Sequence, residues 1–557
     1  MFILKFKKYL RNSAWTLTLA MTLGAMSPAF AAEPATANPQ EVVQQEVKAV
    51  DEKAIPEKEA VGTEVKTEVT TGPAVEIVKE MTPELLEKAA KSKDLTILYY
   101  GDADNNLEED MLNDVQEMKD GITNDVNLVV LMDRIDGESS DSSVLGEDFT
   151  DTRLFNITPG KATRIGGSTQ FPEITTTSNY EANMGDANTL AKLIDFGKAN
   201  YPADKYVLIL SNHGGGVRDG EEADDRLNKA ICWDDTNGGD TLYTGEVSDV
   251  LNRSHSVDVL GYDACVMGMA ELAYQFRPGN GSFEADVMVA SAPNEWGKGW
   301  NYTGLLSRFV NKAGDNGESD ETLGGKEKYF SPGTVSPLEI GATMVEEQRD
   351  STMPSTNTQE LTCFDLSKAA AVKNAVDELS VNLAKYNEKD DMEAIRGPLS
   401  RPVTMMYYKP SGSGDRVSYP FFDLYDLARR VNADRAKFNI EIRNSAQKVM
   451  DAVDEMNAYS FGGSKYAGFQ DGKNGVSIFF PDGDEKYNRN IHWAYQYWYS
   501  PLDTGSVLGK DLLYGKIKWC QDNIDPATKS VGNWFELLDS WFDPTNGADG
   551  GVNGYQW

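Results

Sequence analysis

Short runs of apolar residues alternate with segments of helical periodicity between residues 95 and 291. The apolar runs cover 95–100, 126–133, 206–211, 257–263 and 286–291. Between them, apolar residues recur at every third or fourth position in 106–120, 186–201 and 267–276, which predicts amphipathic helices. Continuous apolar strands separated by helices are typical of a mostly parallel sheet flanked by helices on both faces. The pattern therefore predicts an α/β fold.

The first 31 residues have the pattern of a bacterial export signal. Four basic residues stand near the start, an apolar stretch follows over 14–25, and the small residues around 29–31 suit a cleavage site. An uncleaved signal anchor is the alternative, but the apolar stretch is short for a bilayer span and is interrupted by three threonines and a glycine. We therefore predict a signal peptide over 1–31 and no transmembrane span after its removal. The mature protein is then periplasmic, attached to the cell surface or secreted.

Residues 32–91 differ sharply in composition from the chain beyond residue 91. They are rich in Glu, Lys, Val and Thr and contain no aromatic residue. Such a segment cannot bury enough apolar surface to fold alone, so it is predicted to be an acidic linker or pro-segment. We assign 92–390 to the α/β domain and 391–557 to a C-terminal region packed on or beside it. That last region is less regular and contains one further candidate strand at 475–481.

The formal net charge of −35 over 557 residues makes nucleic acid an unlikely partner, because the chain would repel phosphate backbones. The charge is compatible with cationic peptides and with loosely bound divalent cations. The four cysteines are too few and too scattered for a disulfide framework, so at least one is available as a working thiol.

Two residues that could carry chemistry follow predicted strands. His213, one of only three histidines, comes directly after the strand at 206–211 and before three glycines, and Cys265 follows the strand at 257–263. Catalytic groups in open parallel sheets gather at the carboxyl ends of the strands, so the two side chains are expected to meet. A histidine and the start of a helix would both favour the thiolate of Cys265. The amide groups of Gly214 and Cys265 are candidates for an oxyanion hole.

Asp263 lies two residues before Cys265 and should emerge on the same face of its strand. Two readings of this carboxylate remain equal on spacing alone: it binds a basic substrate side chain, or it caps the following helix.

Two other enzyme classes lack support. No Gly-x-Ser-x-Gly motif indicates a serine hydrolase, and the three dispersed histidines form no zinc motif.

Five segments in order along residues 94–400 resemble the clostripain family of cysteine peptidases, in the clan that includes caspases, legumain and gingipains. They are ILYYGDADNNLEED, EANMGDANTLAKLIDF, YPADKYVLILSNHGGG, LGYDACVMGMAELAYQ and SAPNEWGKGWNY. The resemblance implies a caspase-like fold and a catalytic dyad of His213 and Cys265. It also implies that Asp263 lines a pocket for a substrate Arg or Lys.

The expected function is thus an exported endopeptidase that cleaves after Arg or Lys through a thioester on Cys265. The polar segment between His213 and Cys265 contains basic residues, and the resemblance implies self-cleavage there; Lys229-Ala230 is the preferred bond and Arg226-Leu227 the second. A non-catalytic surface binding protein on the same fold is the alternative.

The chemistry requires no cofactor. Calcium is a possible accessory, because members of the family can depend on it and Asp-rich turns occur at 102–106, 234–240 and 543–549. None of these turns completes an EF-hand loop, and Asx turns explain them equally well, so the metal ligands stay unassigned.

Overall fold

The computed structural model describes residues 93–217, 231–311 except 296, 329–352, 359–396, 421–480 except 465 and 467, 514–523 and 530–542. The predicted signal peptide and acidic linker lie outside the described residues.

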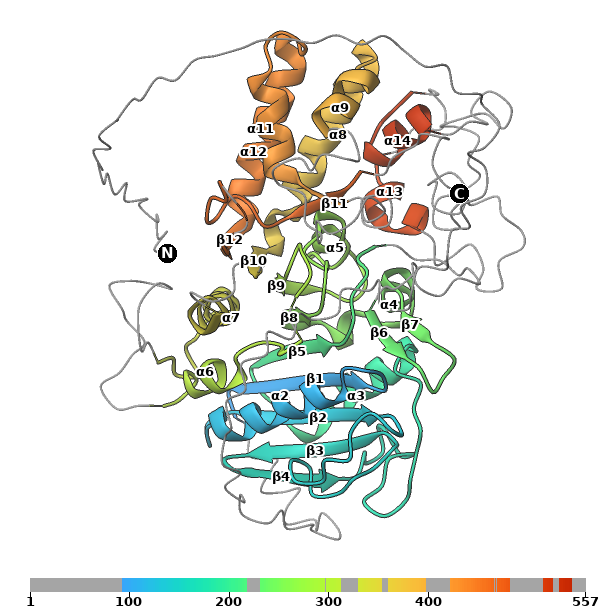
Figure 1. Cartoon of the computed structure of the whole chain (residues 1–557), viewed down its shortest axis with the longest axis vertical. Coiled ribbons are helices and arrows are strands. Elements are labelled where there is room, and N and C mark those ends of the chain that lie inside the picture. The colour runs from blue at the N-terminus through green and yellow to red at the C-terminus, as the bar shows by residue number, and fades with distance from the viewer. Residues whose placement is uncertain are drawn as a thin grey trace, which may run out of the picture. The chain divides into compact units, whose positions relative to one another are not determined.

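A nine-stranded sheet dominates the fold (Figure 1). Its strands, in spatial order, are β12 (Asn457–Gly462), β10 (Glu360–Asp365), β9 (Ala285–Ala290), β8 (Val257–Asp263), β5 (Lys205–Ser211), β1 (Leu95–Ala103), β2 (Asn127–Arg134), β3 (Arg153–Thr158) and β4 (Lys161–Ile165). Two smaller sheets pair β11 (Phe421–Asp423) with β13 (Ser477–Phe479) and β6 (Ile231–Asp234) with β7 (Asp240–Leu242).

The five strands predicted from apolar runs form the centre of this sheet. From β9 to β2 all neighbours pair in parallel, whereas β10 and β12 on one side and β3 and β4 on the other add antiparallel pairings. Every residue of β1 and β2 is buried, which explains why these strands are continuously apolar rather than alternating.

The helices cover both faces of the sheet. They are α2 (Glu108–Gly121), α3 (Ala187–Asn200), α4 (Thr244–Val250), α5 (Ala270–Gln275), α6 (Tyr302–Ser307), α7 (Pro337–Thr352), α8 (Ala369–Tyr386), α9 (Lys389–Arg396), α11 (Leu424–Ala433), α12 (Ile440–Met456), α13 (Lys518–Gln521) and α14 (Trp534–Phe542).

Alternate residues of β1 enter two different cores. Ile97 and Tyr99 pack with α2, α6 and α7, whereas Leu98 and Tyr100 face the core that contains α3, α5, α8 and α12. Because successive side chains of a strand point to opposite faces of the sheet, β1 contributes apolar side chains to both layers. The expected α/β class, a mostly parallel sheet flanked by helices, is confirmed, as is the additional C-terminal region.

The C-terminal region contributes directly to the sheets. Strand β12 forms one edge of the large sheet, and β13 lies within the candidate strand at 475–481. The proposed boundary between 390 and 391 stays a prediction. Within the described residues, none of the helices has the length and apolar character needed to cross a bilayer.

Candidate active site

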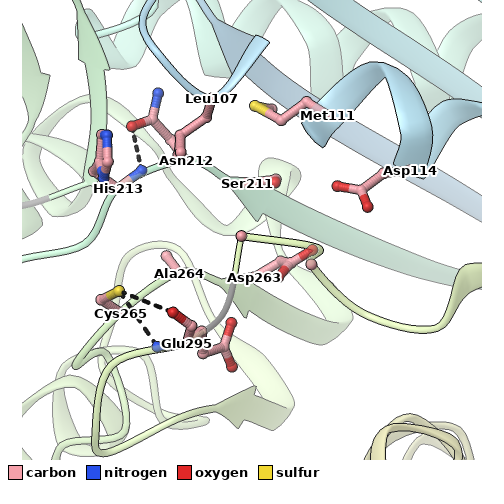
Figure 2. A pocket seen from close by; sticks show the side chains of 12 residues that line it. Leu107, Met111, Asp114, Ser211, Asn212, His213, Asp263, Ala264, Cys265 and Glu295 are labelled. Carbon is pink, nitrogen blue, oxygen red and sulfur yellow. Dashed lines mark hydrogen bonds between the residues drawn. The ribbon is translucent and has the colours of Figure 1, made fainter. Parts of the chain in front are cut away.

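The parallel pairing of β5 with β8 brings the two predicted catalytic residues to one edge of the sheet. Ser211 at the end of β5 is in register with Asp263 at the end of β8, so the chains that carry His213 and Cys265 leave the sheet side by side. Both side chains line one pocket, which Figure 2 shows from close by. The pocket is lined by Leu107, Met111, Asp114, Ser211, Asn212, His213, Asp263, Ala264, Cys265, Glu295, Gly297 and Gly299.

Cys265 differs from the other three cysteines in its surroundings. Cys232, Cys363 and Cys520 are free but buried, and burial raises the pKa of each thiol. Cys265 is only half-buried, and its Sγ accepts a hydrogen bond from the Glu295 N–H at 3.3 Å. The thiol in turn donates to the Glu295 carbonyl oxygen at 3.8 Å. Cys265 therefore combines access with a sulfur position that is fixed by the backbone of Glu295.

The expectation that Cys265 stands at the start of a helix is wrong. Helix α5 begins only at Ala270, and Val266, directly after the cysteine, has a φ of 53°. A residue in this left-handed conformation cannot continue a right-handed helix, so the chain turns before α5 starts. The amide of Glu295 provides the donor that the helix was expected to provide.

The loop that carries His213 is held on two sides. The His213 ring bonds through Nε2 to Asn106 Oδ1 at 2.9 Å, and its backbone N–H donates to Asn212 Oδ1. The buried Asn212 amide in turn donates to Asp102 Oδ2 at 2.7 Å and to the Trp233 carbonyl at 3.3 Å. Because the Asn106 carbonyl oxygen can only accept a hydrogen bond, Nε2 of the neutral ring carries the hydrogen and Nδ1 is the basic nitrogen of His213. Asn106, which follows β1, is a positioning residue that sequence analysis did not identify, although it lies within the Asp-rich turn at 102–106.

Gly214 packs directly against the backbone of Cys265. A Cβ added to Gly214 would lie 2.2 Å from the Cys265 carbonyl oxygen and 3.0 Å from its nitrogen. Only glycine fits this approach without moving one chain.

We therefore expect Gly214→Ala to lower kcat/KM by about a hundredfold, the loss that a displacement of about 1 Å produces in a catalytic constellation. Gly166→Ala is the matched control, because a Cβ there meets its nearest atom at 3.6 Å, an ordinary contact. Steady-state kinetics and the melting temperature of both variants would be compared. Full activity of Gly214→Ala would contradict the close packing described here.

Asp263 points into the pocket and does not cap the following helix. The N-cap of α5 is Met269, and no side chain caps it. Instead, Asp263 Oδ2 accepts hydrogen bonds from the Tyr302 hydroxyl at 2.8 Å and from the Trp300 N–H at 3.3 Å. The structure therefore excludes the prediction that Asp263 caps the following helix.

Two further acidic residues line the same pocket, and sequence analysis missed both. Asp114 from α2 is 2% exposed and Asp263 is 6% exposed, and a Cβ on Gly299 would lie 2.7 Å from both Asp114 oxygens and 2.9 Å from Asp263 Oδ2. Both carboxylates thus converge on Gly299.

Glu295 is also buried in this pocket. Burial, followed by electrostatic repulsion from Asp263 and Cys265, raises the pKa of Glu295 well above its usual range. Glu295 is therefore best suited to a neutral role, while the Asp pair gives the pocket its acidic character.

The remaining predicted residues are only partly described. Lys229 and Arg226 lie outside the described residues, as does the turn at 543–549. The turns at 102–106 and 234–240 are described and contribute Asp104 and Asp234 to a group of four carboxylates whose spacing is compatible with a metal ion.

Comparison with known proteins identifies relatives over most of the chain. The family model described as the clostripain family matches residues 99–541. Clostripain of Hathewaya histolytica is 50% identical over 481 residues, which cover 84% of this chain and 90% of that protein.

Two solved structures illustrate the similarity in fold. A secreted C11 cysteine protease of Bacteroides thetaiotaomicron in complex with an irreversible peptide inhibitor is 16% identical, with a TM-score of 0.47 over 72% of this chain and 97% of that chain. An inactive zymogen C11 protease of Parabacteroides distasonis is 17% identical, with a TM-score of 0.47 over 76% of this chain and 99% of that chain.

A thiol and an imidazole that line one pocket, together with these sequence relatives, define the chain as a cysteine endopeptidase. The extent of the family match and the 50% identity show that it belongs to the clostripain family.

Proposed function

We propose that this peptidase is exported, cleaves after Arg or Lys, and forms a thioester on Cys265. The observation that carries the proposal is the pocket itself, which is lined by Cys265, His213 and the acidic pair Asp114 and Asp263. A cationic side chain in such a pocket would place the following peptide bond beside the thiol.

In the proposed mechanism, His213 takes the proton from Cys265 as its sulfur attacks the scissile carbonyl carbon. The carbonyl oxygen becomes an oxyanion, for which the N–H groups of Gly214 and Cys265 are the candidate donors. His213 then gives the proton to the leaving amine, the C–N bond breaks, and a thioester remains. A water molecule, deprotonated by His213, attacks the thioester and releases the acid product and the free thiol.

The proposed preference for basic residues rests on charge and burial. A carboxylate held in a buried site binds a cation more strongly than an exposed one, because little water screens the pair. Hydrogen bonds from the Tyr302 hydroxyl and the Trp300 N–H hold the Asp263 carboxylate in one orientation. Asp114 adds a second carboxylate beside Gly299.

A panel of fluorogenic peptides tests this function. Substrates with Arg, Lys, Asp, Asn and Leu at the cleavage position should divide into two groups, with Arg and Lys cleaved and the others nearly inert. Running the panel with and without a chelator separates specificity from any requirement for calcium. Equal cleavage of the Leu and Arg substrates would contradict the proposed pocket.

Self-cleavage is expected at Lys229-Ala230 or, second, at Arg226-Leu227. A cut after Lys229 would leave the new amino terminus one residue before β6, which begins at Ile231. Ile231 forms a bridge with Gly214 and pairs with Leu242, so both chain pieces would stay attached to the site.

Mass spectrometry of the purified wild type and Cys265→Ala tests this prediction. Two fragments are expected in the wild type, and an intact chain in the variant. Equal cleavage in both proteins would indicate another protease, and a fully active intact wild type would contradict activation by processing.

The alternative, a non-catalytic surface binding protein, has less support. The cysteine and histidine are both present at the pocket, and the 50% identical relative bears the name of a peptidase.

A further inference from the structure

A three-residue segment forms part of the wall of the active-site pocket. It consists of Gly299, Trp300 and Asn301, which precede α6 and belong to neither a helix nor a strand; we call it the pocket-wall segment. Gly299 lines the pocket beside the carboxylates of Asp114 and Asp263, and the Trp300 N–H donates to Asp263 Oδ2 at 3.3 Å. The position of the pocket-wall segment therefore determines how much room a substrate side chain has beside the two carboxylates.

Gln348 holds the pocket-wall segment by its backbone. The Gln348 side chain comes from α7, is 4% exposed and does not itself line the pocket. Its Nε2 donates to the Gly299 carbonyl at 3.2 Å, and its Oε1 accepts from the Asn301 N–H at 3.1 Å. A carbonyl can only accept and a backbone N–H can only donate, so both ends of the amide meet a matching group. The two hydrogen bonds bracket Trp300 much as a neighbouring strand would.

Helix α7 is tied to α6, the helix that follows the pocket-wall segment. Arg308, the C-cap residue of α6, pairs with Glu346 and with Glu347 of α7 at 2.8 Å each. The Arg308 side chain is 4% exposed and that of Glu346 is fully buried, so little water screens this pair. These contacts fix α7 relative to the pocket-wall segment, and Gln348 is therefore held by a rigid support.

Helix α2 holds the same part of the chain. The Tyr302 N–H donates to Glu117 Oε2 at 3.0 Å, and Glu117 lies one turn after Asp114 in α2. The catalytic side chains come from other elements, since His213 follows β5 and Cys265 follows β8. A displacement of the pocket-wall segment would therefore change the binding of a substrate side chain more than it would change the thiol chemistry.

We propose that Gln348 is a positioning residue for substrate recognition, which fixes the pocket-wall segment at the distance from Asp114 and Asp263 that a basic side chain requires. This inference rests on the proposed preference for Arg or Lys. Without the Gln348 amide, the Gly299 carbonyl and the Asn301 N–H lose a partner, and the segment shifts to recover one, because unsatisfied buried backbone groups are costly. Such a shift loosens the fit around the substrate cation.

Gln348→Met tests the proposal, because it removes both hydrogen bonds and nearly keeps the length and volume of the side chain. We expect kcat/KM for an arginyl peptide to fall about tenfold, mostly through KM, while kcat stays within about twofold of the wild type. The Ki of benzamidine, whose amidinium resembles the arginine guanidinium, should rise by a similar factor. Alkylation of Cys265 by iodoacetamide, a small neutral reagent, should keep its wild-type rate.

Gln275→Met is the matched control. Gln275 is 3% exposed and also makes two hydrogen bonds through its amide, one to Ser248 Oγ at 2.6 Å and one from the Lys518 N–H at 2.9 Å. It lies in α5 and does not line the active-site pocket. Gln275→Met should lower the melting temperature about as much as Gln348→Met does, but its kinetic constants and benzamidine Ki should match the wild type.

Gln348→Asn replaces Gln348→Met if the latter does not fold. Its amide is one methylene group shorter and cannot reach both backbone groups at once, so the same rise in KM and in the benzamidine Ki is expected.

Wild-type KM and benzamidine Ki in a folded Gln348 variant would overturn the inference. A fall in kcat and in the iodoacetamide rate that matches the rise in KM would also overturn it, because Gln348 would then support the whole active site rather than the pocket. Failure of the proposed function would give a different result. The wild-type protein itself would then neither prefer arginyl peptides nor bind benzamidine, and the inference would fall with that function.

Discussion

Replacing Cys265 with alanine is expected to lower peptidase activity by about 10⁴-fold or more while leaving the fold intact. The substitution removes the sulfur that forms the proposed thioester, and no other cysteine lines the pocket. Because Cys265 is half-buried in a loop, its loss should change the melting temperature little. The measurement is kcat/KM for an arginyl substrate together with a thermal melt.

Cys363→Ala is the matched control for this substitution. Cys363 is a free thiol in β10, fully buried in the sheet and outside the pocket. It should retain wild-type turnover even if its melting temperature falls by a few degrees. If the Cys265→Ala protein is active, or if the Cys363→Ala protein is folded but inactive, Cys265 is not the nucleophile.

The second large effect is expected at Asp263. Asp263→Asn removes the charge but keeps the volume, so an arginyl or lysyl substrate should lose about 2 kcal/mol of transition-state binding, or about 30-fold in kcat/KM. The residual activity would reflect Asp114, whose carboxylate also lies beside Gly299. The double variant Asp114→Asn/Asp263→Asn should therefore lose more than either single variant.

Asp286→Asn serves as the control, because Asp286 is an exposed carboxylate on the neighbouring strand β9. Its kcat/KM should match that of the wild type for every substrate. Unchanged kcat/KM of Asp263→Asn for the arginyl substrate would show that the carboxylate serves only to fix Tyr302 and Trp300.

The central strands could be predicted because they are buried on both faces. Burial makes them continuous apolar runs, and the parallel arrangement then requires His213 and Cys265 to leave the sheet at the same edge. Strands β3 and β4 were missed because they contain polar residues such as Arg153, Asn156 and Arg164 within short segments. Strands β10 and β12 lie far along the chain, and local periodicity does not show that they join this sheet.

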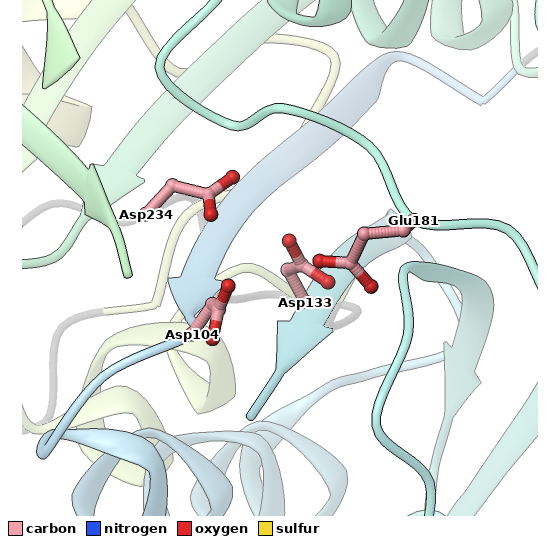
Figure 3. Close-up of side chains that lie close together, drawn as sticks. All are labelled: Asp104, Asp133, Glu181 and Asp234. Atoms are coloured by element: carbon pink, nitrogen blue, oxygen red, sulfur yellow. The ribbon is translucent and has the colours of Figure 1, made fainter. Parts of the chain in front are cut away.

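The catalytic pair was easier to predict than its surroundings. Asp114 lies on an amphipathic helix, and its sequence context does not indicate that this side chain reaches a pocket formed by other segments. The donor to Cys265 comes from Glu295, thirty residues away, rather than from the adjacent helix. The same holds for the group of four carboxylates: Asp104, Asp133, Glu181 and Asp234 are far apart in the sequence, and only the fold brings them together (Figure 3).

The most direct test of the central claim is covalent labelling with an arginyl ketone that alkylates thiols, followed by peptide mapping. The account predicts one equivalent of label, located on Cys265, with little labelling by the leucyl analogue and slow labelling of His213→Ala. Label on another cysteine, or equal labelling by the leucyl compound, would contradict a Cys265 peptidase with a pocket for basic side chains.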